Sequence, residues 1–129
     1  MIVDSSAIVS ILLREPEHKQ VLDALGGASF AGVGAPTLVE SGIVLTAKLG
    51  VSGKTLLARL VQEARLAIVP FGESHRDVAV EASQRFGKGR HPAALNFGDC
   101  LTYAVARVAG QPLLCLGNDF SQTDLELVL

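Results

Sequence analysis

The sequence predicts an α/β protein in which helices cover both faces of a parallel β-sheet. Short apolar segments of strand length alternate along the chain with longer segments whose apolar residues have helical spacing. Acidic residues follow the ends of several apolar segments, where open α/β sheets bind their ligands. The chain has 129 residues, of which 49% are hydrophobic, so it can bury a full core. We expect one domain over residues 1–129.

The first half of the chain is predicted to contain two strands and three helices. The strands are the short apolar segments 1–3 and 30–33. Prolines and glycines mark the helix ends, because Pro16 and Pro36 suit first helical turns while Gly26 and Gly50 stop helices. The helices predicted on this basis are residues 7–13, 17–25 and 36–49.

The second half is predicted to contain three further helices and two strands. Ser52 and Asn96 are well placed to cap helices, and Gly110 ends the last one. The predicted helices are residues 52–65, 74–86 and 96–109, and the predicted strands are residues 66–70 and 113–116. The tail, residues 117–129, is a polar loop followed by a short element rich in leucine and valine.

Four acidic residues are predicted to meet at the carboxyl edge of the sheet. Asp4 ends the first strand, and Glu40 lies near the start of the helix after the second strand. Asp99 lies three residues after Asn96, and Asp119 follows the fourth strand. Carboxylates gathered in this way repel one another unless a divalent cation neutralises them. An all-oxygen site of this kind suits Mg²⁺ or Mn²⁺ rather than zinc.

Most of these acids also have a purely structural explanation. Asp4 can cap the helix that follows it. Asn96 and Asp99 match the two ends of a capping box. Asp119 can belong to a turn, and Asp124 can cap the last short element of the tail.

Glu40 is the most informative of the acids, because aliphatic residues such as Val39 and Ile43 flank it. A buried carboxylate is costly unless a cation pairs with it. Lys48 is two helical turns away, so no basic residue at helical spacing can supply that charge. The alternative is that Glu40 faces solvent at the edge of its helix.

Several kinds of active site are absent from the sequence. No glycine-rich nucleotide motif or P-loop lysine follows a predicted strand. The three histidines are scattered, and no nucleophile elbow supports a Ser-His-Asp triad. Cys100 and Cys115 lack metal-like spacing, so we expect them to be reduced and buried.

Charge and hydropathy limit the partners and the location. The formal net charge is −2, so a nucleic acid must be held by a local positive patch or through metal ions. No apolar run approaches the roughly 18 residues of a membrane span, and the first residues lack the basic segment of a signal peptide. We therefore expect a cytoplasmic location and no membrane partner.

Four motifs occur in order along the chain. They are Val3-Asp4-Ser5-Ser6-Ala7, Glu40 in the helix after the second strand, Asn96-Phe97-Gly98-Asp99-Cys100 and Gly117-Asn118-Asp119-Phe120. Together they resemble the motifs of PIN-domain ribonucleases, and more narrowly those of the VapC toxins of bacterial toxin–antitoxin pairs. The resemblance covers essentially the whole chain. It implies a Rossmann-like three-layer α/β/α sandwich with a parallel sheet of four to five strands.

The resemblance also implies an activity and its residues. The activity is hydrolysis of RNA phosphodiester bonds, in tRNA or another structured RNA, with Mg²⁺ as the cofactor and Mn²⁺ able to substitute. The implied catalytic and metal-binding carboxylates are Asp4, Glu40, Asp99 and Asp119, supported by the hydroxyl of Ser6. Asp124 is close enough in sequence to share or replace the role of Asp119.

The resemblance implies a VapB-type antitoxin as partner, and we also expect a homodimer. The predicted helices 7–13 and 36–49 carry more aliphatic side chains than one sheet face needs. That excess suits a groove for an amphipathic helix of the antitoxin.

RNA is expected to be held by the only stretch in which positive residues crowd, namely Arg85, Lys88, Arg90 and His91. This stretch ends eight residues before Asp99, so it is predicted to border the acidic crevice. The alternative for the stretch is an ordinary solvated loop. The alternative for the whole protein is a catalytically inactive PIN-fold module that binds RNA or protein.

Overall fold

Four short strands form one parallel sheet with the order β3-β2-β1-β4. In the computed structural model, which describes residues 1–129, the strands are β1 (Ile2–Val3), β2 (Gly32–Gly34), β3 (Ala67–Val69) and β4 (Leu113–Leu114). All neighbouring pairs are parallel, as predicted. Leu127 in the tail forms one more parallel bridge to Leu113. The sheet therefore has four strands and the rudiment of a fifth.

Six helices connect and follow these strands. They are α1 (Ser5–Leu12), α2 (His18–Gly26), α3 (Ala35–Leu49), α4 (Val51–Glu63), α5 (Glu73–Phe86) and α6 (Phe97–Ala109). The predicted helices all exist, with ends shifted by one or a few residues. The first helix starts at Ser5 rather than at residue 7, because Asp4 is its N-cap and accepts a hydrogen bond from the Ser6 amide. No helix is long and apolar enough to cross a membrane.

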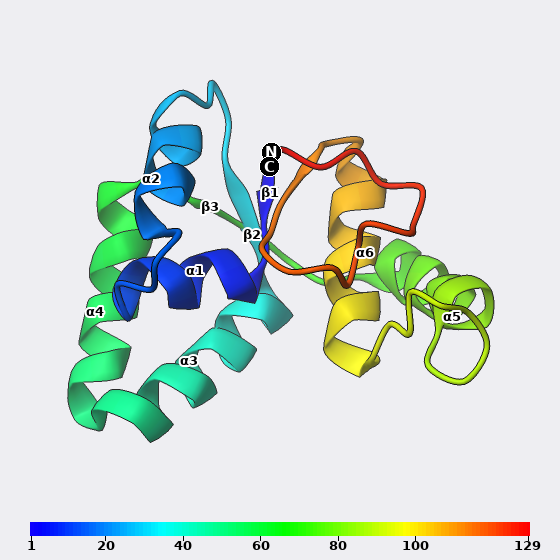
Figure 1. The fold of residues 1–129 in the computed structure, drawn as a ribbon, viewed down its shortest axis with the longest axis horizontal. Helices are drawn as coiled ribbons and strands as arrows, with labels where there is room; N and C mark the ends of the chain where they lie inside the picture. The colour runs from blue at the N-terminus through cyan, green and yellow to red at the C-terminus, as the bar shows by residue number, and fades with distance from the viewer.

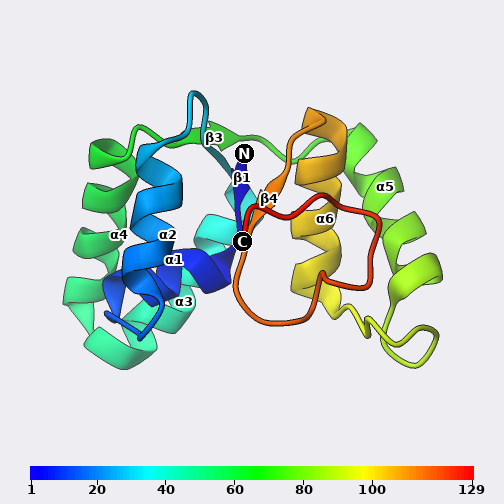
Figure 2. The ribbon, with the colours of Figure 1, turned by 45° about the horizontal axis from the view of Figure 1, so that its top comes forward.

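The helices lie in two layers on opposite faces of the sheet (Figures 1 and 2). Helices α1 to α4 cover one face, and α5 and α6 cover the other, together with the tail. Adjacent residues of a strand point to opposite faces. Accordingly, Ile2 and Leu113 belong to the core beneath α5 and α6, whereas Val3 and Leu114 belong to the core beneath α1 to α4. The predicted three-layer α/β/α sandwich is confirmed.

The second strand lies further along the chain than predicted, at residues 32–34 instead of 30–33. Close packing explains this choice of a Gly-Val-Gly strand. A Cβ atom on Gly34 would lie 2.9 Å from a methyl group of Val105 in α6, and one on Gly32 would lie 3.0 Å from the ring of Phe30. The two glycines let other elements approach the strand, so they belong to the sheet rather than bounding it.

The strand order places the topological switch point of the sheet between β1 and β4. The chain runs from β1 to β2 to β3 in one direction and then returns to β4 on the other side of β1. The chain therefore leaves β1 toward one edge of the sheet, while β4 pairs with the opposite side of β1. Open α/β sheets bind ligands at such a switch point, outside the carboxyl ends of the strands. Asp4 follows β1 directly, and Asp119 lies in the loop after β4.

Candidate active site

Asp4 follows β1 directly and caps α1. Its Oδ2 accepts hydrogen bonds from the amide of Ser6 at 3.1 Å and from the Ser6 hydroxyl at 2.6 Å. The side chain is buried, with the residue only 6% exposed. Both hydrogen bonds use Oδ2, so Oδ1 stays free of protein donors. The capping role that the sequence suggested for Asp4 is therefore confirmed.

Ser6 links the ends of the two central strands. Its hydroxyl donates to Asp4 and accepts a hydrogen bond of 3.0 Å from the amide of Leu116, just after β4. This arrangement fixes the Asp4 carboxylate relative to the loop that leads to Asp119.

Asp99 lies in the first turn of α6 and forms the predicted capping box. Its Oδ2 accepts from the amide of Asn96 at 3.0 Å, while Asn96 Oδ1 accepts from the amide of Asp99 at 2.8 Å. The pKa of Asp99 is raised to about 6, mainly because the carboxyl is buried. The hydrogen bond from the Asn96 amide lowers this pKa, whereas the negative charges of Asp119, Asp4 and Glu40 raise it further. The four acids thus lie near enough to influence Asp99. We call Asp4, Glu40, Asp99 and Asp119 the acidic site.

Glu40 reaches the acidic site across the start of α6. It is half-buried on α3, and its Oε2 lies directly against the backbone of Gly98. The positive end of a helix macrodipole favours a carboxylate in this position. The start of α6 covers one side of Glu40, whereas its neighbours Val39 and Ile43 are 62% and 66% exposed. Val39 and Ile43 line a hollow together with Glu40 and leave most of their own surface exposed to solvent.

Replacing Gly98 with alanine should displace Glu40 and leave the fold intact. The new Cβ atom would overlap Oε2 of Glu40, which is the mobile end of a long side chain and can rotate away. Alanine is also the better helix former by about 1 kcal/mol. We expect the thermal midpoint to be unchanged or slightly higher, and RNA cleavage to fall roughly 10- to 100-fold from the misplaced carboxylate. Cleavage at the native rate in a folded variant would show that Glu40 needs no fixed position.

The structure places the two candidate acids of the tail differently. Asp119 is exposed in the loop after β4, and its charge also helps to raise the pKa of the buried Cys115 thiol to about 12, although burial is the larger cause. Asp124 instead accepts hydrogen bonds from Tyr103, Arg85 and Arg107. The structure brings Asp119 to the acidic site and leaves Asp124 at the side of α6.

The donor set of the acidic site suits Mg²⁺ or Mn²⁺. All four groups are carboxylates, which are the ligands that these hard cations prefer. No three acidic, histidine or cysteine side chains converge closely enough to form a complete ligand set. Mg²⁺ usually keeps several of its waters and binds through only one or two carboxylates. Loosely grouped acids are therefore compatible with this ion and would not suit structural zinc.

Replacing Asp99 with asparagine should stabilise the metal-free protein above pH 6. The pKa of Asp99 is about 6 in the folded protein against an ordinary value of 3.8, so the folded state binds the proton more tightly. The stability contributed by that proton is fully present below about pH 4 and is lost as the pH rises through 6. Asparagine carries no charge, so the thermal midpoint of the variant should exceed the native one at pH 7.5 and match it near pH 4. A difference that does not change with pH would contradict the raised pKa.

Residues 87–96 join α5 to α6, and the loop of residues 87–92 within this connection is closed at its base. The amide of Lys88 donates to the carbonyl of Leu95 at 3.1 Å, and the amide of Leu95 donates to the carbonyl of Phe86 at 2.9 Å. Lys88 and Arg90 are exposed. His91 packs edge-on against the buried Phe86, with ring centroids 5.1 Å apart. Phe86 is part of the core, and the two exposed cations carry the positive character of the loop.

Arg85 is engaged elsewhere. Its guanidinium lies 3.2 Å from Asp124 and 3.8 Å from Glu81, and these contacts connect α5 to the tail. The partners Tyr103 and Arg107 of Asp124 were not singled out from the sequence. Tyr103 lies four residues after Asp99 on α6 and Arg107 four residues after Tyr103, and this regular spacing is the signal that would have found them.

An apolar hollow of about 440 Å³ adjoins Glu40. It lies between α3 and the start of α6, and its rim includes Val39, Ile43 and Phe97, the last of which is 80% exposed. By contrast, α1 exposes no large hydrophobic side chain. Of the two helices predicted to carry surplus aliphatic surface, only α3 presents it to solvent, because α2 and α3 pack against α1.

Comparison with known proteins assigns the family. The PIN domain model matches residues 1–126. Ribonuclease VapC36 of Mycobacterium tuberculosis is 50% identical over 127 residues, which are 98% of this chain and 91% of that protein. Ribonuclease VapC of Mycolicibacterium smegmatis is 38% identical over 128 residues, covering 99% of both chains.

Solved structures of low sequence identity share the fold. VapC20 of Mycobacterium tuberculosis, described as a sarcin-ricin loop cleaving toxin, superposes with a TM-score of 0.81 at 17% identity, covering 98% of this chain and 97% of its own. VapBC2 from Rickettsia felis, bound to a DNA fragment from its promoter, has a TM-score of 0.78 at 15% identity, with 98% and 95% covered. A family model over nearly the whole chain and relatives of up to half identity lead to one assignment: the chain belongs to the PIN-domain family and, within it, to the VapC ribonucleases.

Proposed function

We propose that this VapC ribonuclease is the toxin of a toxin–antitoxin pair and that it cuts RNA with the help of a divalent cation. The observation that carries the proposal is the gathering of Asp4, Glu40, Asp99 and Asp119 from four separate parts of the chain. Together with burial, that gathering raises the pKa of Asp99 to about 6. Groups with such perturbed pKa values in a crevice are typical of active sites.

The acidic site would hold Mg²⁺, with Mn²⁺ able to substitute. When bound, such an ion supplies an activated water at neutral pH and neutralises charge on the leaving oxygen of the phosphodiester. The protein contributes the orientation of the ligands. Ser6 holds the Asp4 carboxylate with Oδ1 free, and the amide of Asn96 holds Asp99. Above pH 6 Asp99 is ionised and ready to bind a cation.

The RNA strand would approach along the loop of residues 87–92. Lys88 and Arg90 are the exposed cations there, and His91 lies beside them. The protein as a whole is acidic, with a formal charge of −2, so a local grip is needed to hold a polyanion next to carboxylates. Arg85 adds to the positive potential of this region while its guanidinium stays paired with Asp124. A structured RNA such as tRNA is the proposed substrate class, and the cytoplasm is the proposed location.

The proposed partners are a VapB-type antitoxin and a second copy of the chain. The antitoxin follows from membership of the VapC ribonucleases. The dimer is supported by exposed apolar side chains that run from α3 across the start of α6 to α5, namely Val39, Ile43, Phe97 and Val80. Patches of this kind on small proteins mark interaction surfaces. Light scattering that gives the mass of a monomer at high micromolar concentration would exclude the dimer.

The second candidate function is a PIN-fold module that binds RNA or protein without cutting RNA. The observation that favours it is that no three acidic side chains converge into a complete ligand set. The two functions differ in whether the acids are needed for the effect on RNA.

Expression without an antitoxin separates the two functions. The native protein and the Asp99→Asn variant are produced at equal levels in a bacterial host, and the 5′ ends of cellular RNA are mapped. The toxin proposal expects growth arrest and new RNA ends with the native protein only. Equal growth of both strains, with no new ends, would favour the binding module.

A further inference from the structure

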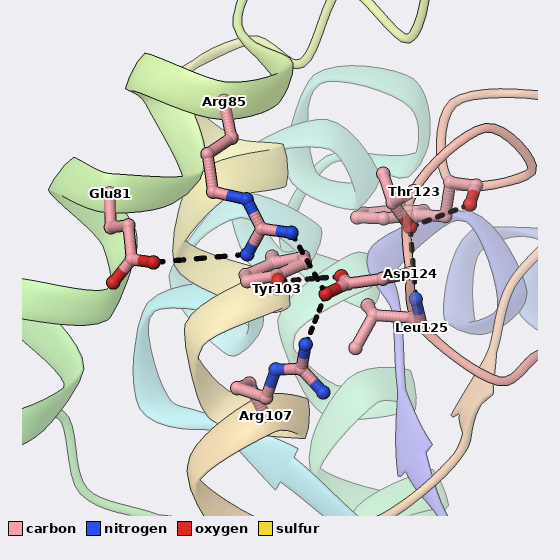
Figure 3. Close-up of polar contacts among 8 residues, drawn as sticks. Glu81, Arg85, Tyr103, Arg107, Thr123, Asp124 and Leu125 are labelled. Atoms are coloured by element: carbon pink, nitrogen blue, oxygen red, sulfur yellow. Dashed lines mark hydrogen bonds and ion pairs between the residues drawn. The ribbon is translucent and has the colours of Figure 1, made fainter.

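The carboxylate of Asp124 joins the tail to two helices (Figure 3). Its Oδ1 accepts a hydrogen bond of 2.6 Å from the hydroxyl of Tyr103. Its Oδ2 accepts from Arg85 on α5 at 3.2 Å and from Arg107 on α6. One tail residue thus receives three donors, of which two are guanidinium groups.

The donors on α6 lie on the same helical face as an acid of the active site. Asp99, Tyr103 and Arg107 follow one another at intervals of four residues, which places them in a row along the helix. The tail meets this row at two points. At the start of α6, the charge of Asp119 is near enough to Asp99 to raise the pKa of that carboxyl. Further along the helix, Asp124 contacts Tyr103 and Arg107.

The segment between these two points is braced. Phe120 is 1% exposed and belongs to the core beneath α5 and α6. The hydroxyl and the amide of Thr123 donate to the carbonyl of Phe120 at 2.8 and 3.1 Å, and the hydroxyl of Ser121 donates to the carbonyl of Asn118 at 2.9 Å. Consecutive turns therefore connect Asp119 to Asp124, so a displacement at one end is transmitted to the other.

We propose that Asp124 is a positioning residue, whose contacts with Tyr103, Arg85 and Arg107 fasten the tail along α6 and so hold Asp119 at the acidic site. The role of Asp119 in this proposal rests on the proposed function. Charge-assisted hydrogen bonds of this kind are about twice as strong as neutral ones. Burial alone would raise the pKa of Asp124. The pKa nevertheless lies below its ordinary value, because Tyr103 and Arg85 donate hydrogen bonds to the carboxylate and Arg107 adds a positive charge beside it. The Asp124 carboxylate therefore stays charged near neutral pH.

The test compares Asp124→Asn with the native protein. Asparagine keeps the size of the side chain and an acceptor for Tyr103, but it removes the charge that both arginines need. We expect the amides of Ser121 and Thr123 to exchange hydrogen at least tenfold faster. We expect kcat for cleavage of a fixed RNA to fall about tenfold with KM changed less than twofold, because Asp119 is displaced whereas Lys88 and Arg90, the exposed cations that would hold the RNA, have no contact with Asp124. Mn²⁺ affinity, followed by the electron spin resonance of the free ion, should fall in parallel.

Glu81→Gln is the matched control. This substitution removes one negative charge, as Asp124→Asn does, and Glu81 is the other acidic partner of Arg85. Glu81 forms no hydrogen bond or ion pair with the tail. Exchange in the tail, kcat and Mn²⁺ affinity should all stay native. Tyr103→Phe is the second test variant, since it deletes one donor without changing the fit of the buried ring, and it should give a smaller change in the same direction.

The outcomes separate this proposal from the proposed function. Fast tail exchange with native kcat and native Mn²⁺ affinity would overturn the positioning role, as would native exchange in Asp124→Asn. A native protein that cuts no RNA would overturn the proposed function. In that case, amide hydrogen exchange in the tail and Mn²⁺ affinity, compared between Asp124→Asn and the native protein, still decide whether Asp124 holds Asp119 in place.

Discussion

Asp99→Asn should remove nearly all RNA cleavage, with kcat/KM lower by about 100-fold or more. The substitution deletes a charge from the centre of the acidic site and leaves the volume unchanged. The fold should survive, because asparagine can still accept the hydrogen bond that the Asn96 amide donates to Asp99. Asp4→Asn should have a similar effect on cleavage, and asparagine is as good an N-cap as aspartate. Initial rates on a labelled RNA, with circular dichroism as the check of folding, measure both effects.

Asp77→Asn provides the matched control for both variants. Asp77 is an exposed residue of α5 that pairs only with Arg76, so the same loss of charge there should leave the rate unchanged. EDTA should abolish cleavage by the native protein, and added Mg²⁺ or Mn²⁺ should restore it. Cleavage at full rate in EDTA, or in Asp99→Asn, would rule out the mechanism by metal and carboxylates.

The double variant Lys88→Ala, Arg90→Ala should bind RNA more weakly and with less dependence on salt. A grip of about three phosphates on a single strand gives a slope of roughly −2 for the logarithm of affinity against the logarithm of salt concentration. Removing two exposed cations should reduce the magnitude of that slope by about one to two and weaken binding across sequences. Binding is measured in the Asp99→Asn background so that the RNA survives.

Lys54→Ala, Arg59→Ala is the control with the same change in charge. Both residues are exposed on α4, in the helical layer on the other face of the sheet from the loop of residues 87–92. This pair should weaken binding only slightly and leave the slope close to native. An equal effect of the two pairs would mean that net charge, rather than a local grip, attracts the RNA.

The local features of this protein were predictable from its sequence. Gly50, Asn96 and Gly110 mark helix ends, and the alternation of apolar segments with helices indicated a parallel sheet covered on both faces. These signals are local, because capping and periodicity depend on residues a few positions apart. The position of Asp4 directly after a strand was equally informative, since the carboxyl ends of parallel strands meet at one edge.

The environments of several side chains depended on contacts between distant segments. Glu40 packs against Gly98, which is 58 positions later in the chain, while its own neighbours Val39 and Ile43 are mostly exposed. Helical periodicity shows that residues share a face but does not show which face the next helix covers.

The sequence by itself determined the order of the elements, the parallel sheet and the placement of acids after strand ends. Only the tertiary structure decided the surroundings of the two acids of the tail, because the path of residues 117–129 is set by the burial of Phe120 and the bridge from Leu127 to Leu113. That path brings Asp119 to Asp99 and Asp124 to Arg85 and Arg107. Two aspartates five positions apart in one polar loop look alike in sequence, and the charges around each of them come from helices elsewhere in the chain.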